Sequence, residues 1–378
     1  MGASSFDPYD LWCTSFGIRA RQSFYRGAFS GKLGALAVVL ADWLLPLTSR
    51  KLLGAQPRAY PILSAHKWLL TAHQGVSSGC CKAALYDLRS QAVGLPDMAA
   101  WGLGFPWMSK NGLYEPDVPF VTHTPYVMEA LLVLADRPEL YDEAMSLFHG
   151  TWNFLESLKV MHRDKDELAL SYAPVEEPRI VVNANSYAAF AYALHSVHGK
   201  SEVRDEASLK AKHLARWVVR QQQTDGSWFY YADREHGNFI DCFHSCFVIK
   251  NLLKVKRLLP DLEDIVEQPI DKGWRYIKEK FFDRRAGLCR RFTVRSHRDP
   301  FRWDLYDQAE FLGLLVDFGE LDRAIDFARC VEKRFSKGSN WYCRIDVFGR
   351  RWGRNFLRWG IMPFWYHRSR LEKAVEGK

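Results

Sequence analysis

The chain has 378 residues, of which 48% are hydrophobic and 25% charged, so it can bury a large core and is not a disordered chain. Its net charge of +8 favours an acidic partner. However, the sequence has no zinc-finger spacing, no aromatic RNA-binding run and no Lys-rich tail, so we expect no nucleic-acid partner. The eight cysteines form no CxxC pair and no metal-ligand spacing, so we predict neither a metal nor any other cofactor.

Residues 1–59 are predicted to form an N-terminal extension with an amphipathic or apolar helix. Residues 1–9 carry no basic run before an apolar one, so no secretory signal is visible. Scattered, unpaired cysteines suit the reducing cytoplasm. Residues 33–47 are apolar, but Asp42 and Pro46 interrupt them and they are too short to cross a bilayer. Because basic residues flank this segment, a buried helix and a peripheral contact with the inner membrane both remain open.

A repeat of roughly 60 residues, longer than the repeats of known helical solenoids, follows from residue 60 onward. Each copy begins with polar residues and continues into an apolar helix. The five clear copies begin at His123, Asn183, Asp241, Asp304 and Asn355, and a weaker one begins at Ser64. Helices that are apolar nearly all round are expected to be buried on every side.

A second kind of helix lies between these copies, with one apolar and one charged face. Its examples are residues 141–158, 204–223, 261–281 and 321–335. Short strand-like pieces follow them, at residues 167–174, 226–233, 286–293 and 340–347. The pattern predicts an all-α fold over residues 60–378, an (α/α)6 toroid with six inner and six outer helices. The polar starts of the inner helices and the short β pieces would then gather at one mouth.

Two motifs resemble a known family. Trp-Gly-Leu-Gly-Phe-Pro-Trp at residues 101–107, followed by Val-Thr-His-Thr-Pro at residues 121–125, resembles the signature of (α/α)6 proteins from bacterial exopolysaccharide and O-antigen biosynthesis clusters. Arg358-Trp359 matches their closing segment, although Gly360, Ile361 and Met362 depart from it. The resemblance covers about residues 60–368 and implies a fold and a pathway rather than a reaction.

More distant resemblances add further enzyme classes to the reactions that this fold could carry out. The ring resembles polysaccharide lyases, unsaturated glucuronyl hydrolases and glucuronyl C5-epimerases. Residues 221–228 also resemble a repeat of terpene cyclases, but the acidic runs that those enzymes use for catalysis are absent from this sequence. An acidic oligo- or polysaccharide is therefore the expected partner.

Removal of the proton beside a uronate carboxylate needs a base, an opposing acid and groups that neutralise the carboxylate. The candidates for proton transfer are His123, Tyr126, His244 and Tyr306. The candidates for substrate binding are Trp107, Asn183, Tyr187, Trp228, Asp241, Asp304, Asp307, Tyr342, Arg344, Arg354 and Arg358. The leading hypothesis is an epimerase or lyase in which Tyr306 or His244 removes the C5 proton. Arg344 and Asn183 would hold the carboxylate, and His123 or Tyr126 would act from the opposite side.

Other interpretations of the same residues stay open. A glycoside hydrolase needs two carboxylates about 5–10 Å apart, which Asp241, Asp304, Asp307, Glu310 and Glu129 offer. A non-catalytic glycan-binding or scaffold protein needs only the aromatic and Arg side chains. Asn183, Asp241 and Asp304 also stand where helix N-caps belong, and the tyrosines and histidines are equally suited to a core. The sequence places Arg354 and Arg358 on one face of the last helix.

Overall fold

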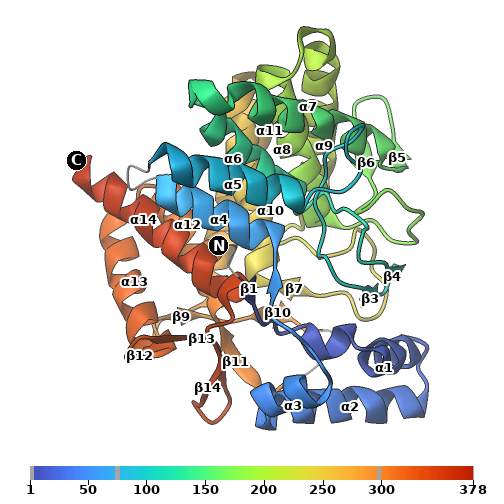
Figure 1. The fold of residues 1–378 in the computed structure, drawn as a ribbon, viewed down its shortest axis with the longest axis vertical. Coiled ribbons are helices and arrows are strands. Elements are labelled where there is room, and N and C mark those ends of the chain that lie inside the picture. Colours follow the sequence, from blue (N-terminus) through green and yellow to red (C-terminus); the bar gives the residue numbers. More distant parts are fainter. Residues whose placement is uncertain (1–3, 73–76, 296–298, 378) are drawn as a thin grey trace.

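The computed structural model describes residues 4–72, 77–295 and 299–377. Six helices line the inside of a closed ring, and each packs against the next in chain order. These are α4 (Pro61–Ala72), α6 (Thr124–Ala135), α8 (Val182–His198), α10 (Cys242–Leu258), α12 (Leu305–Asp317) and α14 (Met362–Glu376). The ring closes because α14 packs against both α12 and α4 (Figure 1). The predicted toroid is therefore confirmed.

Helices on the outside of the ring cover the inner ones. They are α5 (Ser78–Ser90), α7 (Tyr141–Ser157), α9 (Arg204–Arg220), α11 (Glu263–Tyr276) and α13 (Leu321–Phe335). The burial pattern explains the two layers: α8 is buried without a break over its first four turns, whereas α13 buries only its apolar stripe. Within the described residues we find these five outer helices, where the repeat suggested six.

The inner helices begin close to the predicted polar residues. His123, Asp241 and Asp304 are the residues before the first turns of α6, α10 and α12, and Asn183 lies in the first turn of α8. The last copy differs, because α14 begins only at Met362. The placement of Arg354 and Arg358 on one helix face is wrong: Arg354 ends strand β14 (Arg351–Arg354), and Arg358 lies in an irregular turn, Leu357–Ile361.

One glycine explains this irregular turn. Gly360 has φ +84°, which favours glycine, and a Cβ there would lie 2.5 Å from the backbone nitrogen of Tyr306. The turn can therefore press closely against the start of α12. This contact carries the neighbouring Trp359 side chain onto the mouth of the ring.

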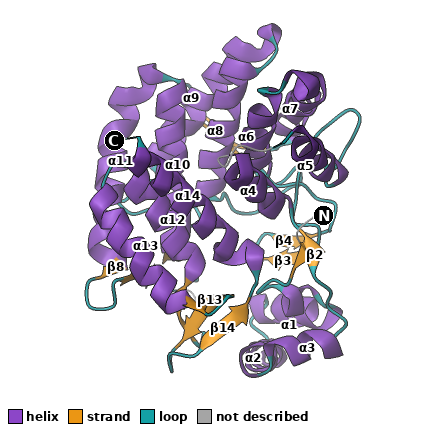
Figure 2. Cartoon of the chain, turned by 60° about the vertical axis from the view of Figure 1, so that its left-hand side comes forward, coloured by secondary structure: helices purple, strands orange, loops and turns teal. Residues whose placement is uncertain are grey.

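Short antiparallel strands gather at the mouth end of the ring (Figure 2). The pairs are β3 (Trp107–Ser109) with β4 (Gly112–Tyr114), β5 (Val160–Arg163) with β6 (Leu168–Leu170), β7 (Ile240–Asp241) with β10 (Phe292–Val294), and β8 (Phe282–Asp283) with β9 (Leu288–Cys289). A larger sheet joins β11 (Phe301–Asp304), β12 (Ser336–Lys337), β13 (Asn340–Asp346) and β14. Three of the four predicted strand-like pieces are confirmed; residues 226–233 form only a single bridge, between Tyr231 and Val181.

The N-terminal residues also lie at this end. Strand β1 (Ser4–Ser5) pairs with β2 (Arg58–Ala59), and between them lie α1 (Ser15–Tyr25), α2 (Phe29–Leu44) and α3 (Pro46–Leu52). The buried Arg50 fastens this region, because its guanidinium donates to Asp10 at 2.9 Å and to Asp42 at 2.6 Å. Trp352 of β14 donates its ring N–H to the carbonyl of Asp42 at 2.8 Å. The extension is thus tied to the strands at the mouth.

Candidate active site

A histidine–aspartate pair lies at the start of α10. Nδ1 of His244 is 2.8 Å from a carboxylate oxygen of Asp241, one helical turn away. Asp241 is buried, whereas the His244 side chain keeps 22% of its surface exposed. A carboxylate on Nδ1 fixes the tautomer in which Nε2 is free to accept a proton. The pair therefore has the arrangement of an oriented general base.

The space next to His244 is small. A cavity of about 10 Å³, room for about one water molecule, lies among the side chains of Asn183, Trp228, Tyr230, Asp241 and His244. The Oδ1 atom of Asn183 is buried and, within the described residues, has no hydrogen-bond partner. Trp228 borders the cavity but is itself buried, with its ring N–H donated to the carbonyl of Val218.

Asp304 lies on the neighbouring inner helix and is fully engaged. Its carboxylate accepts hydrogen bonds from the backbone N–H of Tyr306, from Nε of Arg344 at 2.8 Å and from the ring N–H of Trp359 at 2.9 Å. Both Asp304 and Arg344 are buried. Asp304 therefore acts as the predicted N-cap and as an anchor for Arg344 and Trp359, which leaves neither charge free for a substrate.

Asp307, three residues further along α12, has a different environment. Its Oδ1 accepts the backbone N–H of Phe243 at 3.1 Å, while its Oδ2 is buried and, in the part of the chain that the structure describes, has no partner. Burial, followed by the negative charges of Asp304 and Asp241, raises the pKa of Asp307 well above its ordinary value. Asp307 is therefore a neutral acid that holds the start of α10 against α12.

We call Asp241, His244, Asp304, Asp307 and Trp359 the mouth cluster. Part of the N-terminal extension covers it. Asp7 accepts a hydrogen bond from Nε of Arg358 at 2.5 Å, and both residues are buried. The Tyr9 ring lies 4.4 Å from the ring of Trp107 and 4.9 Å from that of Trp359. At the mouth, the carboxylate of Asp7 thus binds Arg358, and the ring of Tyr9 packs against Trp107 and Trp359.

His123 lies beside the same arginine. Its Nδ1 is 3.2 Å from the hydroxyl of Thr122, and its buried Nε2 has no partner among the described residues. Burial and then the positive charge of Arg358 lower the pKa of His123 to about 3. His123 is therefore neutral at pH 7 and lies on a different inner helix from His244.

A second polar layer lies deeper in the ring, with one member from each inner helix; we call it the buried network. The hydroxyls of Tyr126 and Tyr187 are 2.6 Å apart, and Lys250 donates to Tyr126 at 2.9 Å and to Glu310 at 2.8 Å. His367 lies 3.8 Å from Glu310, and the His66 ring packs edge-on against Tyr126. The members are His66, Tyr126, Tyr187, Lys250, Glu310 and His367, and all are buried.

The charges of the buried network neutralise one another. Burial alone would raise the pKa of Glu310, but the ammonium group of Lys250 holds it well below the ordinary carboxyl value. Burial raises the pKa of Tyr126 and Tyr187 well above the usual range, so both stay neutral phenols. Tyr126 and Tyr187, predicted at the mouth, therefore lie in this sealed layer. The buried Tyr306 ring lies above it, 5.1 Å from the ring of Trp359.

The remaining predicted residues lie at the periphery. Tyr342 is half-buried on β13, and Arg354 is exposed on the adjacent β14. Glu129, one of the alternative carboxylates, is paired with Lys254 at 2.6 Å and is not part of the mouth cluster. At or beside the mouth the structure places Trp107, His123, Asn183, Trp228, Asp241, His244, Asp304, Tyr306, Asp307, Arg344 and Arg358. It does not bring Tyr126, Tyr187, Tyr342 or Arg354 to this place.

Sequence reasoning missed the contributions of Asp7, Tyr9 and Lys250. Lys250 carried a signal, because it is a charged residue that follows the apolar residues 246–249 of α10. Asp7 and Tyr9 carried none, since they reach the mouth through contacts with residues more than 90 positions away in the chain.

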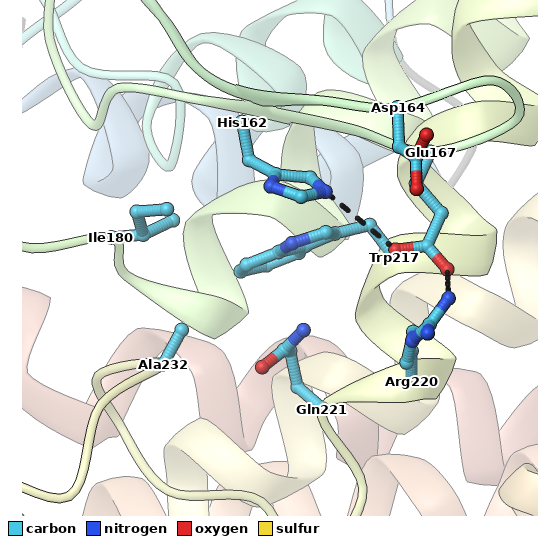
Figure 3. Close-up of a pocket in the computed structure, with 8 residues that line it drawn as sticks. All are labelled: His162, Asp164, Glu167, Ile180, Trp217, Arg220, Gln221 and Ala232. Carbon is cyan, nitrogen blue, oxygen red and sulfur yellow. Dashed lines mark hydrogen bonds and ion pairs between the residues drawn. The ribbon is translucent and has the colours of Figure 1, made fainter.

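A larger depression of about 330 Å³ lies elsewhere, beside the end of α9 and the β5–β6 hairpin (Figure 3). Its buried carboxylate, Glu167, is bound by Arg220 at 2.6 Å and lies 3.8 Å from His162. Arg220 neutralises Glu167, and His162 is too far from this carboxylate for a hydrogen bond, so the depression holds no imidazole that a hydrogen-bonded carboxylate orients. The oriented pair at His244 is therefore the better candidate despite its smaller space.

The described residues contain no group of three or more His, Cys, Asp or Glu side chains suited to a metal ion. All eight cysteines are present as thiols. Neither observation adds a cofactor to the site.

Comparison with solved structures identifies the fold. A sugar epimerase from a ruminal bacterium matches with a TM-score of 0.61 at 12% identity, covering 86% of this chain and 90% of the epimerase. Cellobiose 2-epimerase from Bacillus thermoamylovorans B4167 matches with a TM-score of 0.60 at 13% identity, over 84% and 88% of the two chains.

The GH76 α-mannanase of Bacteroides thetaiotaomicron matches with a TM-score of 0.57 at 10% identity, over 84% and 87%. The chain has the (α/α)6 fold. No protein-family model and no curated protein matches the sequence.

Proposed function

We propose that the protein is a carbohydrate-active enzyme that moves a proton on a sugar carbon beside a carboxylate or carbonyl group. The observation that carries this proposal is the Asp241–His244 pair, a partly exposed imidazole oriented by a buried carboxylate. Nε2 of His244 would take the proton, and Asp241 would stabilise the imidazolium that forms. Sugar epimerases and an isomerase among the structural neighbours support the same reaction class.

The state of the carboxylates favours this reaction over glycoside hydrolysis. A hydrolase needs two carboxyl groups that are free to act on the sugar. Asp241 is bound to His244, Asp304 to Arg344 and Trp359, and Glu310 to Lys250. Asp307 is buried and neutral. None of these groups is available as an ionised nucleophile or base.

An acidic, uronate-containing glycan is the proposed substrate class. From the sequence, we assigned the uronate carboxylate to Arg344. Because Arg344 is bound to Asp304, Arg358 is the better partner for that carboxylate. Arg358 already binds the carboxylate of Asp7, and its Nη2 has no partner within the described residues. The motif resemblance adds bacterial surface polysaccharide biosynthesis as the pathway. A sugar does not fit the cavity beside His244 as it stands. We propose that binding of the sugar displaces Tyr9 from its place between Trp107 and Trp359.

The experiment measures isotope exchange in heavy water with a panel of uronic-acid glycans, and with cellobiose and mannose as neutral sugars. Mass spectrometry should detect deuterium uptake in a sugar, and a lyase would also produce an unsaturated chromophore. His244→Gln should lower the exchange rate by a factor of about 10² to 10⁴. His162→Gln is the matched control, because His162 is a half-exposed histidine in the depression of Figure 3.

Three results would overturn this proposal. Accumulation of reducing ends without deuterium uptake would identify a hydrolase. Binding of a glycan with neither reaction would identify a non-catalytic binding protein. Loss of activity in His162→Gln instead of His244→Gln would move the active site to the depression beside α9.

A further inference from the structure

Helices α1–α3 expose an apolar surface that none of the other described residues covers. More than half of the large apolar side chains that are exposed in the described residues belong to residues 16–53. On α2, Phe29, Leu33, Leu36, Leu40 and Leu44 are between 40% and 74% exposed, and Leu52 of α3 is 80% exposed. Their spacing along α2 puts the first five on one side of that helix. We call this surface the apolar face.

The opposite side of α2 is fixed to the protein. Gly31 lies so close to α1 that a Cβ there would be 2.2 Å from the backbone nitrogen of Phe24. Val38 is buried, and Asp42 is bound by Arg50 and by the ring of Trp352 through its carbonyl. Because α2 is held along this side, the apolar face is a fixed surface and not the inner side of an unpacked helix.

The charges around the apolar face have one sign. Arg19, Arg26, Lys32 and Lys51 are exposed. Asp42 is the only acidic residue between positions 15 and 58, and its carboxylate is neutralised by the buried Arg50. The surface is therefore apolar with a basic rim, and this composition suits an anionic lipid surface.

We infer that the apolar face docks onto an anionic lipid bilayer. Soluble monomers rarely expose a continuous apolar patch of this kind without a partner. A second copy of the chain fits less well, because it would bring two sets of basic residues together without acidic partners. No single described helix is long and apolar enough to cross a bilayer; α2 and α3 pass that test only together, with a bend of 119°. Since the opposite side of α2 packs on the protein, the helices would lie in the interface.

Docking would set the orientation of the ring. Helices α1–α3 lie at the same end as the strands and the starts of the inner helices in both views (Figures 1 and 2). The mouth would therefore be held beside the bilayer. If the function proposed above holds, a glycan carried on a lipid is the substrate class that this orientation favours.

The test is flotation of the purified full chain with vesicles of phosphatidylcholine containing 30 mol% phosphatidylglycerol, compared with pure phosphatidylcholine. The protein should float with the anionic vesicles and bind less well as salt rises, because part of the attraction is screened. Leu33→Glu combined with Leu36→Glu should weaken binding by about tenfold or more, since both side chains leave the apolar interface. Leu209→Glu is the matched control, because Leu209 is 54% exposed on the outer helix α9.

Circular dichroism and thermal melting verify that all variants are folded, and light scattering reports the oligomeric state. Absence of flotation with either vesicle would overturn the inference. A dimer that the double variant dissociates would assign the apolar face to a second copy instead. Vesicle binding is read without any sugar, so its failure is distinct from failure of the proposed chemistry.

Discussion

The mouth cluster and the buried network both take residues from α10 and α12 but differ in access and charge. Both place polar side chains on the inner face of the ring, about two helical turns apart on α10, at His244 and Lys250. In the mouth cluster, the His244 side chain remains 22% exposed, whereas Lys250 and Glu310 are only 6% and 1% exposed. The recurrence of polar residues along inner helices therefore marks two layers, and only the first can meet a substrate.

The largest predicted effect tests the buried network. Glu310→Leu removes the partner of Lys250 and leaves a buried ammonium group, which should lower the free energy of unfolding by about 3–5 kcal/mol. Urea denaturation at pH 7 measures the loss. The double variant Lys250→Met with Glu310→Leu should recover most of it, because the uncompensated charge is gone. Equal losses in the single and double variants would show that the ion pair is not the cause.

The next effect separates two carboxyl groups on one helix. Asp304→Asn weakens the charged hydrogen bonds from Arg344 and Trp359 and should cost about 3 kcal/mol. Asp307→Asn replaces a protonated carboxyl group by an amide and should raise stability at pH 7, because the unfolded variant has no proton to lose at this position. Chemical denaturation of both variants at pH 7 makes the comparison. A larger loss at Asp307 than at Asp304 would contradict the protonated state of Asp307.

The sign of the pH dependence at Asp307 follows from its raised pKa. The folded state keeps this proton after the unfolded state has lost it, so the contribution of Asp307 is present at low pH and is lost as pH rises above the ordinary aspartate value of about 3.9. Asp307→Asn should therefore remove a decline in stability between that value and neutral pH.

A smaller effect compares His66, which belongs to the buried network, with His123, which lies beside Arg358. Burial lowers the pKa of both His66 and His123 to about 3. Each contributes stability that is present above the unfolded value of about 6.5 and lost as pH falls towards 3, by about 1.4 kcal/mol per pH unit. His66→Gln and His123→Gln should each flatten this slope in urea denaturation between pH 7 and pH 5. An unchanged slope in either variant would show that the histidine is not buried in the neutral form.

The smallest effect is expected at Arg354, and Arg358 serves as its comparison. Arg354→Ala should alter stability by no more than about 0.5 kcal/mol, because the side chain is exposed at the end of β14. Arg358→Ala leaves the buried Asp7 unpaired and should be clearly destabilising. Thermal melting of the two variants compares them directly. Similar losses in both would mean that Arg354 also has a structural partner.

The sequence predicted the ring well because its evidence is local. Polar N-terminal residues followed by apolar helices identify the inner layer, and His123, Asp241 and Asp304 do precede α6, α10 and α12. The start of α14 was placed too early, although Gly360 and Pro363 were visible signals for a turn and a first helical residue.

The site was predictable only in part. The contact between His244 and Asp241 follows from spacing along one helix. The spacing of residues along a helix does not show how far a side chain lies from the mouth. Tyr126 and Tyr187 were therefore assigned to the mouth although they belong to the buried network. The covering of the mouth by Asp7 and Tyr9 depends on contacts between distant parts of the chain, which no local pattern specifies.

Closure of the ring by α14 against α4 also has a consequence for how the chain folds. These two helices lie at opposite ends of the ring sequence, so their contact has a high sequence separation and a large entropy cost of loop closure. During synthesis, the apolar sides of α4 and its neighbours remain without their last partner until α14 has been made. His66 and His367, which close the buried network from these two helices, are therefore the last of its members to meet.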